Sequence, residues 1–269
     1  MKTREIRVGS SVIGGSAFSV VAGPCSIENQ KQLMTVANHV SERGAAMLRG
    51  GVFKMRTDPK SFQGLGKDAL PLIREAKAAT GLPFAVEVAD PSHIEFFADD
   101  VDVLQVGSRN MHNYYLLKEL GKTRKPIILK RGLAAHLKEW ILAIDYIVAG
   151  GNEQVILCER GIRTFEPELR NTVDLAGAVW AQQKSGFPVI LDPSHGTGSP
   201  DLIAPMAKAA LAAGLDGIMV EVHPNPACAL SDGFQALTLE NFDQLITGLH
   251  PIAQALGKKI SRNGSSEQK

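Results

Sequence analysis

The sequence has few of the features that mark secreted, membrane or nucleic-acid-binding proteins. It has 3 cysteines in 269 residues, an odd number that argues against a disulfide framework and for a reducing cytosol. Lys and Arg outnumber Asp and Glu by 29 to 28, so no global field attracts nucleic acid or an anionic membrane. No apolar run approaches the ~18 residues of a membrane helix, and the charged residues 1–7 predict no signal peptide. We therefore expect a cytoplasmic protein that binds neither nucleic acid nor a membrane.

Short apolar runs alternate with amphipathic segments along the chain. Nearly continuous apolar runs are typical of parallel strands that are covered on both faces. The predicted strands are 19–22, 46–49, 84–88, 103–106, 126–130, 154–158, 188–192 and 217–222. The predicted helices are 30–43, 66–80, 91–99, 112–121, 134–149, 168–185, 200–213 and 238–256. Eight strand–helix units in about 250 residues predict an α/β protein with a single (β/α)₈ barrel. An open doubly wound sheet is the alternative.

The remaining segments lie at the two ends of the predicted barrel. Residues 5–8 and 11–13 are expected to pair as a hairpin, which makes 1–16 an N-terminal extension. The barrel is expected to span 17–257. Residues 258–269 are polar and rich in Gly and Ser, and are predicted to form a flexible tail.

Four residues at or after predicted strand ends have side chains that bind metals. A barrel enzyme places its active site at the carboxyl ends of its strands, so barrel closure would bring these residues together. They are Cys25, His195, Glu221 and Asp232. One thiolate, one imidazole and two carboxylates suit Mn²⁺, Fe²⁺, Zn²⁺ or Co²⁺. The alternative is a buried cysteine, a capping histidine and surface acids, because dispersed ligands lack a local signature such as CxxC.

Cations form a second group at the same strand ends. The group comprises Arg49, Lys54, Arg56, Arg109, Lys130, Arg160 and Arg163. Arginine binds phosphate and carboxylate groups through two parallel hydrogen bonds, and lysine adds a point charge. The alternative is a set of solvated rim charges, but charges at the ends of apolar strands are costly without a partner. The pattern predicts a site for more than one anionic group.

Seven motifs stand in order along the chain. They are AGPCSIE at 22–28, KMRT at 54–57 with SFQG at 61–64, VGSRNM at 106–111, LKRG at 129–132, LCERGIRTFE at 157–166, DPSHGTG at 192–198, and VEVHP at 220–224 with ALSDG at 229–233. From about residue 5 to 255 the chain resembles the type I, beta-subtype 3-deoxy-D-arabino-heptulosonate 7-phosphate (DAHP) synthases. The resemblance implies a metal-dependent condensation of phosphoenolpyruvate with erythrose 4-phosphate, the first step of the shikimate pathway.

The resemblance also implies roles for individual residues. Cys25, His195, Glu221 and Asp232 match the family's metal ligands. Arg49, Lys54, Arg109, Lys130 and Arg160 match its phosphoenolpyruvate contacts. Arg56 and Thr57 match its contacts to the phosphate of erythrose 4-phosphate, and Arg163 is expected to add to this substrate site. The expected catalytic residues are Lys54, Cys25 and His195, with Lys54 donating a proton, orienting water or only pairing charge.

The chain departs from the family at one loop, and other functions stay open. The usual Lys-Pro-Arg-Thr-Ser-Pro-Tyr is replaced here, with Met55, Asp58 and Lys60 at the variant positions. We expect weaker binding of erythrose 4-phosphate or a changed aldose preference, with neutral loop drift as the alternative. The alternative functions are a 3-deoxy-D-manno-octulosonate 8-phosphate synthase that uses arabinose 5-phosphate, and a non-catalytic phosphosugar-binding barrel.

The resemblance finally bears on assembly and regulation. Barrels of this family associate, so a homodimer or homotetramer is expected. Because the predicted barrel fills the chain, no separate regulatory domain and no feedback inhibition are expected.

Overall fold

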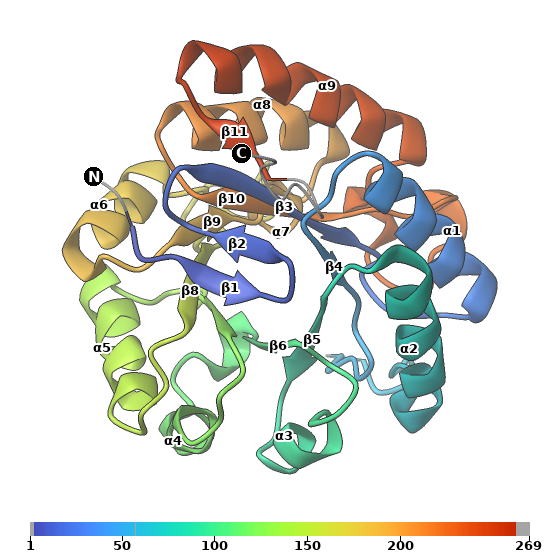
Figure 1. Ribbon diagram of the computed structural model, residues 1–269, viewed down its shortest axis with the longest axis horizontal. Coiled ribbons are helices and arrows are strands. Elements are labelled where there is room, and N and C mark those ends of the chain that lie inside the picture. Colours follow the sequence, from blue (N-terminus) through green and yellow to red (C-terminus); the bar gives the residue numbers. More distant parts are fainter. Residues whose placement is uncertain (1–2, 57, 262–269) are drawn as a thin grey trace.

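The protein is a closed barrel of eight parallel strands with helices between them (Figure 1). The computed structural model describes residues 3–56 and 58–261. The barrel strands are β3 (Ala17–Gly23), β4 (Met47–Arg49), β5 (Phe84–Val88), β6 (Val103–Val106), β7 (Ile127–Lys130), β8 (Val155–Glu159), β9 (Val189–Leu191) and β10 (Gly217–Glu221). Each pairs with the next, and β10 closes the barrel on β3 with Gly217 opposite Ser19 and Glu221 opposite Gly23. The predicted (β/α)₈ fold is confirmed.

The helices surround the strands. They are α1 (Gln30–Glu42), α2 (Ala69–Thr80), α3 (Ser92–Phe96), α4 (Tyr114–Gly121), α5 (Leu137–Val148), α6 (Leu175–Ser185), α7 (Pro193–Thr197), α8 (Pro200–Ala212) and α9 (Leu239–Ala255). Single 3₁₀ turns are η1 (Gly66–Asp68), η2 (Ser108–Asn110), η3 (Pro226–Cys228) and η4 (Gly233–Gln235). None of these helices, in the part of the chain that is described, is long and apolar enough to cross a membrane.

The apolar side chains of the strands alternate between two cores. One core fills the barrel and includes Val21, Met47, Ile128 and Met219. The other packs between the strands and the surrounding helices. Because both faces of every barrel strand are covered, the strands read as continuous apolar runs in the sequence.

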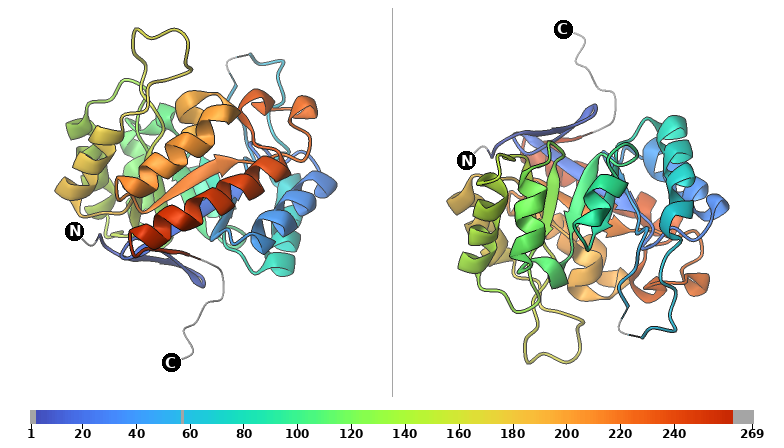
Figure 2. Two further views of the ribbon diagram at one scale, coloured as in Figure 1. Left: turned by 90° about the horizontal axis from the view of Figure 1, so that it is seen from above. Right: turned by 90° about the horizontal axis from the view of Figure 1, so that it is seen from below.

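A hairpin closes one end of the barrel, as predicted. Its strands β1 (Ile6–Val8) and β2 (Ser11–Ile13) pair antiparallel with Ile6 opposite Ile13. Their apolar side chains join the core inside the barrel. Figure 2 shows the hairpin at one end of the molecule, while the loops after β4 and β8 project at the other. The hairpin therefore leaves the opposite mouth open.

Three local predictions are corrected by the structure. The helix predicted at 168–185 begins only at Leu175, because the side chain of Asp174 accepts a hydrogen bond from Gly177 N and caps it there. The short helix α7 was not predicted. Two residues of the predicted tail form strand β11 (Lys259–Ile260), which pairs with Ala17 and Phe18 of β3 outside the closed barrel. Residues 262–269 of the predicted tail lie outside the described residues.

One buried carboxylate ties several elements together at the hairpin end. Asp216, just before β10, accepts hydrogen bonds from Thr3 Oγ1 (2.7 Å), Gln182 Nε2 (2.8 Å) and Val189 N (2.9 Å). Burial raises the pKa of Asp216, and the three hydrogen bonds oppose that rise. The contacts join the N-terminal segment, α6 and β9 to the start of β10.

Replacing Asp216 with alanine should therefore destabilise the fold. The change leaves the buried Val189 N–H and two side-chain donors without their acceptor, so we expect the free energy of unfolding to fall by about 2–3 kcal/mol. Urea unfolding at pH 7 measures this. The control is Asp99→Ala in the exposed segment after α3, where a change within about 0.5 kcal/mol is expected. Equal stability of the two variants would contradict the role of Asp216.

Candidate active site

The open mouth of the barrel contains a cationic cavity of about 490 Å³. Its lining has the seven cations Lys54, Arg56, Arg109, Lys130, Arg160, Arg163 and Arg170 and the three acids Asp58, Glu87 and Asp232. They come from strand ends and from the loops after β4, β6, β8 and β10. The positive charge of a nearly neutral protein is thus concentrated where the strands end.

Six of the seven predicted cations line this cavity. The seventh, Arg49, lies in a smaller adjoining cavity with Cys25, while Lys54 and Glu87 line both. Thr57 lies outside the described residues. Arg170 was not among the predicted cations, because its position was assigned to a helix. Only the true start of α6 shows that it stands in a loop above the cavity.

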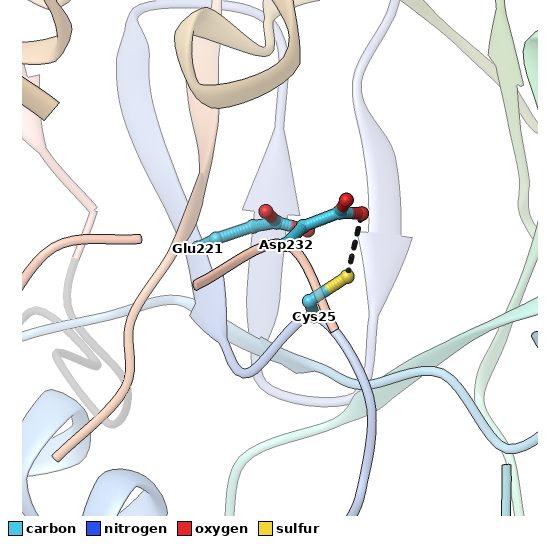
Figure 3. Close-up of side chains that lie close together, drawn as sticks. All are labelled: Cys25, Glu221 and Asp232. Atoms are coloured by element: carbon cyan, nitrogen blue, oxygen red, sulfur yellow. Dashed lines mark hydrogen bonds between the residues drawn. The ribbon is translucent and has the colours of Figure 1, made fainter. Parts of the chain in front are cut away.

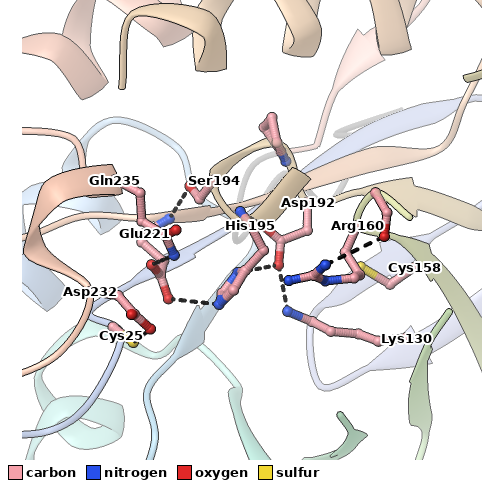
Figure 4. A network of polar contacts seen from close by, with 12 residues as sticks. Cys25, Lys130, Cys158, Arg160, Asp192, Ser194, His195, Glu221, Asp232 and Gln235 are labelled. Atoms are coloured by element: carbon pink, nitrogen blue, oxygen red, sulfur yellow. Dashed lines mark hydrogen bonds and ion pairs between the residues drawn. The ribbon is translucent and has the colours of Figure 1, made fainter. Parts of the chain in front are cut away.

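Three of the four predicted metal-binding side chains form a compact cluster. Ligand atoms of Cys25, Glu221 and Asp232 all lie within 4.8 Å of one another, and Cys25 Sγ is 3.2 Å from Asp232 Oδ2 (Figure 3). The fourth, His195, lies beside this cluster with Nε2 at 3.5 Å from Glu221 Oε1 (Figure 4). The structure thus brings together side chains from β10, from α7 and from the loops after β3 and β10.

The buried charge at Glu221 is compensated on several sides. Burial alone would raise the pKa of this carboxyl, but His195, Arg49 and Lys54 lower it well below its usual range. Arg49 Nη1 donates a hydrogen bond to Glu221 Oε1 at 2.7 Å. Burial raises the pKa of the Cys25 thiol to about 12. Glu221 is therefore ionised, while burial favours the protonated thiol of Cys25.

Asp192 orients the ring of His195. Its Oδ2 accepts hydrogen bonds from His195 Nδ1 (2.8 Å) and from Lys130 Nζ, and its Oδ1 accepts one from His195 N (3.0 Å). Burial works against the ionised form of Asp192, yet His195 and Lys130 keep its pKa well below the usual range. Because the ionised carboxylate of Asp192 only accepts, Nδ1 is the donor, and the other ring nitrogen, Nε2, faces Glu221.

This donor set fits a divalent metal ion. It combines one sulfur, one imidazole nitrogen and carboxylate oxygens in a buried place, and the hydrogen bond from His195 Nδ1 to a carboxylate is the usual support of a ligating histidine. The mixed set of hard and soft donors selects no single metal. The cluster is therefore a possible metal site, and its donor set does not identify the ion.

Lys54 stands between the cluster and the cationic cavity. Its Nζ is 3.1 Å from Cys25 Sγ and 3.4 Å from Cys25 O. Burial lowers its pKa, but surrounding negative groups, Glu221 and Glu87 among them, raise it by more. Lys54 is therefore a buried, protonated amine that borders both halves of the site.

The sequence analysis did not identify two polar residues near the cluster of Cys25, Glu221 and Asp232. Ser231 Oγ lies 3.2 Å from Cys25 Sγ and accepts a hydrogen bond from Arg56 Nη1. Gln235 Nε2 donates to Glu221 Oε2 at 2.6 Å. The signal was the SDG motif around Asp232, since residues that flank a ligand on a tight loop must lie near the same site.

The comparisons with known proteins agree with this architecture. Residues 4–255 match the profile of the DAHP synthetase I family. The phospho-2-dehydro-3-deoxyheptonate aldolase of Thermotoga maritima is 43% identical over 256 residues, which are 95% of this chain and 76% of that protein. A 2-dehydro-3-deoxyphosphooctonate aldolase of Geobacter sulfurreducens is 30% identical over 93% of this chain and 98% of its own length.

Two solved structures are similar over nearly the whole chain. The crystal structure of the Thermotoga maritima DAHP synthase superposes with a TM-score of 0.94 at 43% identity, over 97% of this chain and 76% of that one. A truncated form of 3-deoxy-D-arabino-heptulosonate 7-phosphate synthase from the same organism gives 0.90 at 40% identity, over 97% and 95%. This chain belongs to the DAHP synthetase I family.

Proposed function

We propose that the protein is a DAHP synthase, which condenses phosphoenolpyruvate with erythrose 4-phosphate and water to give DAHP and phosphate. The observation that carries this proposal is the cavity with seven cations beside a Cys/Glu/Asp cluster. Phosphoenolpyruvate has a phosphate and a carboxylate, and the tetrose has a second phosphate. Three anionic groups in one reaction require such a concentration of Lys and Arg.

We assign the cluster to one divalent ion, Mn²⁺, Fe²⁺, Zn²⁺ or Co²⁺, bound by Cys25, His195, Glu221 and Asp232. When bound, the ion supplies Lewis acidity for the tetrose aldehyde. Proximity supports His195 as the fourth ligand, since its Nε2 faces Glu221. Cys25 and His195 act in catalysis as ligands of this ion.

The cations divide between the two substrates. We place phosphoenolpyruvate against Arg49, Lys54, Arg109, Lys130 and Arg160, and the tetrose phosphate against Arg56 and Thr57, with Arg163 nearby. The buried Nε of Arg49 has no hydrogen-bond partner in the described chain, which supports an anion at this position. Arg109 is held in place through its bond to the Met55 carbonyl, 3.1 Å.

The reaction then needs one carbon–carbon bond and one proton donor. The electron pair of the phosphoenolpyruvate double bond forms the new bond from C3 to the aldehyde carbon, and the aldehyde oxygen takes up a proton. Water adds to the electron-deficient C2 and releases one proton, which balances the proton taken up by the aldehyde oxygen. The C–O bond to phosphate in the resulting hemiketal phosphate then breaks, and the hydroxyl proton passes to the departing phosphate as the C2 carbonyl forms. Lys54 is the protonated group closest to both halves of the site, so we assign it either the donation of that proton or the orientation of the water.

A phosphate-release assay with two aldoses tests the function. With phosphoenolpyruvate and metal, we expect erythrose 4-phosphate to give phosphate release and arabinose 5-phosphate to be at least about tenfold slower. EDTA should abolish release, and added Mn²⁺ should restore it. Faster turnover of arabinose 5-phosphate would assign the octulosonate reaction instead. No release with either aldose and any of the four metals would indicate a non-catalytic phosphosugar-binding barrel.

Asp58 should weaken binding of the tetrose phosphate. Its carboxylate lines the cationic cavity, and it accepts a hydrogen bond from Lys60 N at 2.9 Å. Asp58→Asn keeps this acceptor but removes the charge, so KM for erythrose 4-phosphate should fall about two- to fivefold, the value of a weak exposed charge interaction. KM for phosphoenolpyruvate should not change. Steady-state kinetics measure both, with Asp99→Asn after α3 as the remote control. An unchanged KM for the tetrose would favour neutral drift of this loop.

We also propose a cytoplasmic homodimer or homotetramer. Large apolar side chains are exposed on the packed pair α4 and α5, namely Tyr115 (69% exposed) and Leu142 (46%). Exposed apolar surface of this kind is typical of subunit interfaces. Light scattering should give two or four times the chain mass of 28.8 kDa. A mass equal to one chain at micromolar concentration would contradict the proposal.

A further inference from the structure

A chain of hydrogen bonds connects the loop after β8 to the carboxylate of Glu221. Gln235 lies between them. Its Oε1 accepts a hydrogen bond from Arg170 Nη1, and its Nε2 donates one to Glu221 Oε2 at 2.6 Å (Figure 4). Gln235 is completely buried. A buried amide with both of its ends bonded is fixed in one orientation.

The direction of this chain is set by chemistry. Guanidinium groups only donate hydrogen bonds, so the oxygen of the Gln235 amide must face Arg170. Its NH₂ group must then face Glu221, which as a carboxylate only accepts. The carboxylate by itself already favours the NH₂ group of the amide, and the bond from Arg170 to the amide oxygen holds the same orientation from the other side.

The backbone places Gln235 on the same turn as another metal-type residue. Asp232 begins the turn η4 with φ at +50°, and it is the one non-glycine residue with positive φ in the described chain. Gln235 ends that turn three residues later. One short turn therefore presents Asp232 to the cluster and Gln235 to Glu221.

The two carboxylate oxygens of Glu221 have different partners. Oε1 accepts from Arg49 and lies 3.5 Å from His195 Nε2, while Oε2 accepts from Gln235. The Glu221 N–H donates to Ser194 Oγ at 3.0 Å. The carboxylate plane is thus fixed from both sides, and Gln235 is the contact that belongs to the turn of Asp232.

We propose that Gln235, oriented by Arg170, is a positioning residue that fixes Glu221 for metal binding and links that ligand to Asp232. The inference rests on the metal site of the proposed function and deepens it. The backbone N–H of Gln235 donates to Asp232 O at 3.2 Å, whereas its side chain bonds Glu221, so the side chain acts through that carboxylate. Loss of the Gln235 side chain should lower metal affinity by about 10- to 100-fold, which is usual when a hydrogen-bond partner of a metal ligand is removed.

Metal affinity without substrates tests this. Mn²⁺ binding to the full chain is measured by competition with a fluorescent chelator for the parent, Gln235→Leu, Arg170→Met and Gln182→Leu. Gln235→Leu should raise the Mn²⁺ dissociation constant at least about tenfold, and Arg170→Met should raise it by a smaller factor. Gln182→Leu is the matched control, because it removes the same kind of amide–carboxylate bond, to Asp216, at the far end of the barrel.

The outcomes separate this inference from the function on which it rests. If the parent binds Mn²⁺ and both site variants bind it within twofold of the parent, the positioning role is wrong while the metal site stands. If the parent binds no Mn²⁺, Fe²⁺, Zn²⁺ or Co²⁺, the metal site itself is wrong. Should Gln235→Leu fail to fold, as shown by its thermal unfolding without metal, Arg170→Met on the exposed loop decides. Gln182→Leu should lower thermal stability and leave the dissociation constant unchanged; a tenfold rise there as well would indicate a general loss of stability and overturn the proposal.

Discussion

The ionised carboxylate of Glu221 is the constraint from which the rest of the site follows. A buried charge is tolerated only with partners of opposite charge and with hydrogen bonds, and here Arg49, His195 and Gln235 supply them. The parallel pair of β10 and β3 sets Glu221 opposite Gly23, two residues before Cys25. Closure of the barrel therefore brings a thiol from the start of the chain beside a carboxylate from its end.

Asp192 connects His195, beside the cluster of Cys25, Glu221 and Asp232, to the cationic cavity. The same carboxylate oxygen accepts from His195 on one side and from Lys130 on the other. A change in the charge of His195 or Lys130 therefore alters the hydrogen bond that the other residue donates to Asp192. Lys54 makes a similar connection from the opposite wall, between Cys25 and the cavity. The two groups found separately in the sequence are electrostatically one site.

The sequence predicted the strands well and the loops poorly, for physical reasons. All eight barrel strands begin and end within two residues of their predicted bounds. A strand that is buried on both faces has apolar residues at successive positions, and such a run is easy to recognise in the sequence. Arg170 and Gln235 were missed because loop geometry has no periodicity to detect. The amphipathic pattern at 168–185 begins before the helix does. The N-cap at Asp174 sets the start of α6 at Leu175. The proximity of Cys25, Glu221 and Asp232 could be predicted from the rule that barrel sites lie at strand ends.

The position of Arg170 gives the loop after β8 a double role. The guanidinium lines the anion cavity and also bonds Gln235, which in turn bonds Glu221. Gly198 allows this approach, since a Cβ there would lie 2.5 Å from Arg170 Cβ. An anion that draws Arg170 toward the cavity would compete with its bond to Gln235. Binding of anions and the orientation of Glu221 are then thermodynamically linked, and the linkage acts equally in both directions.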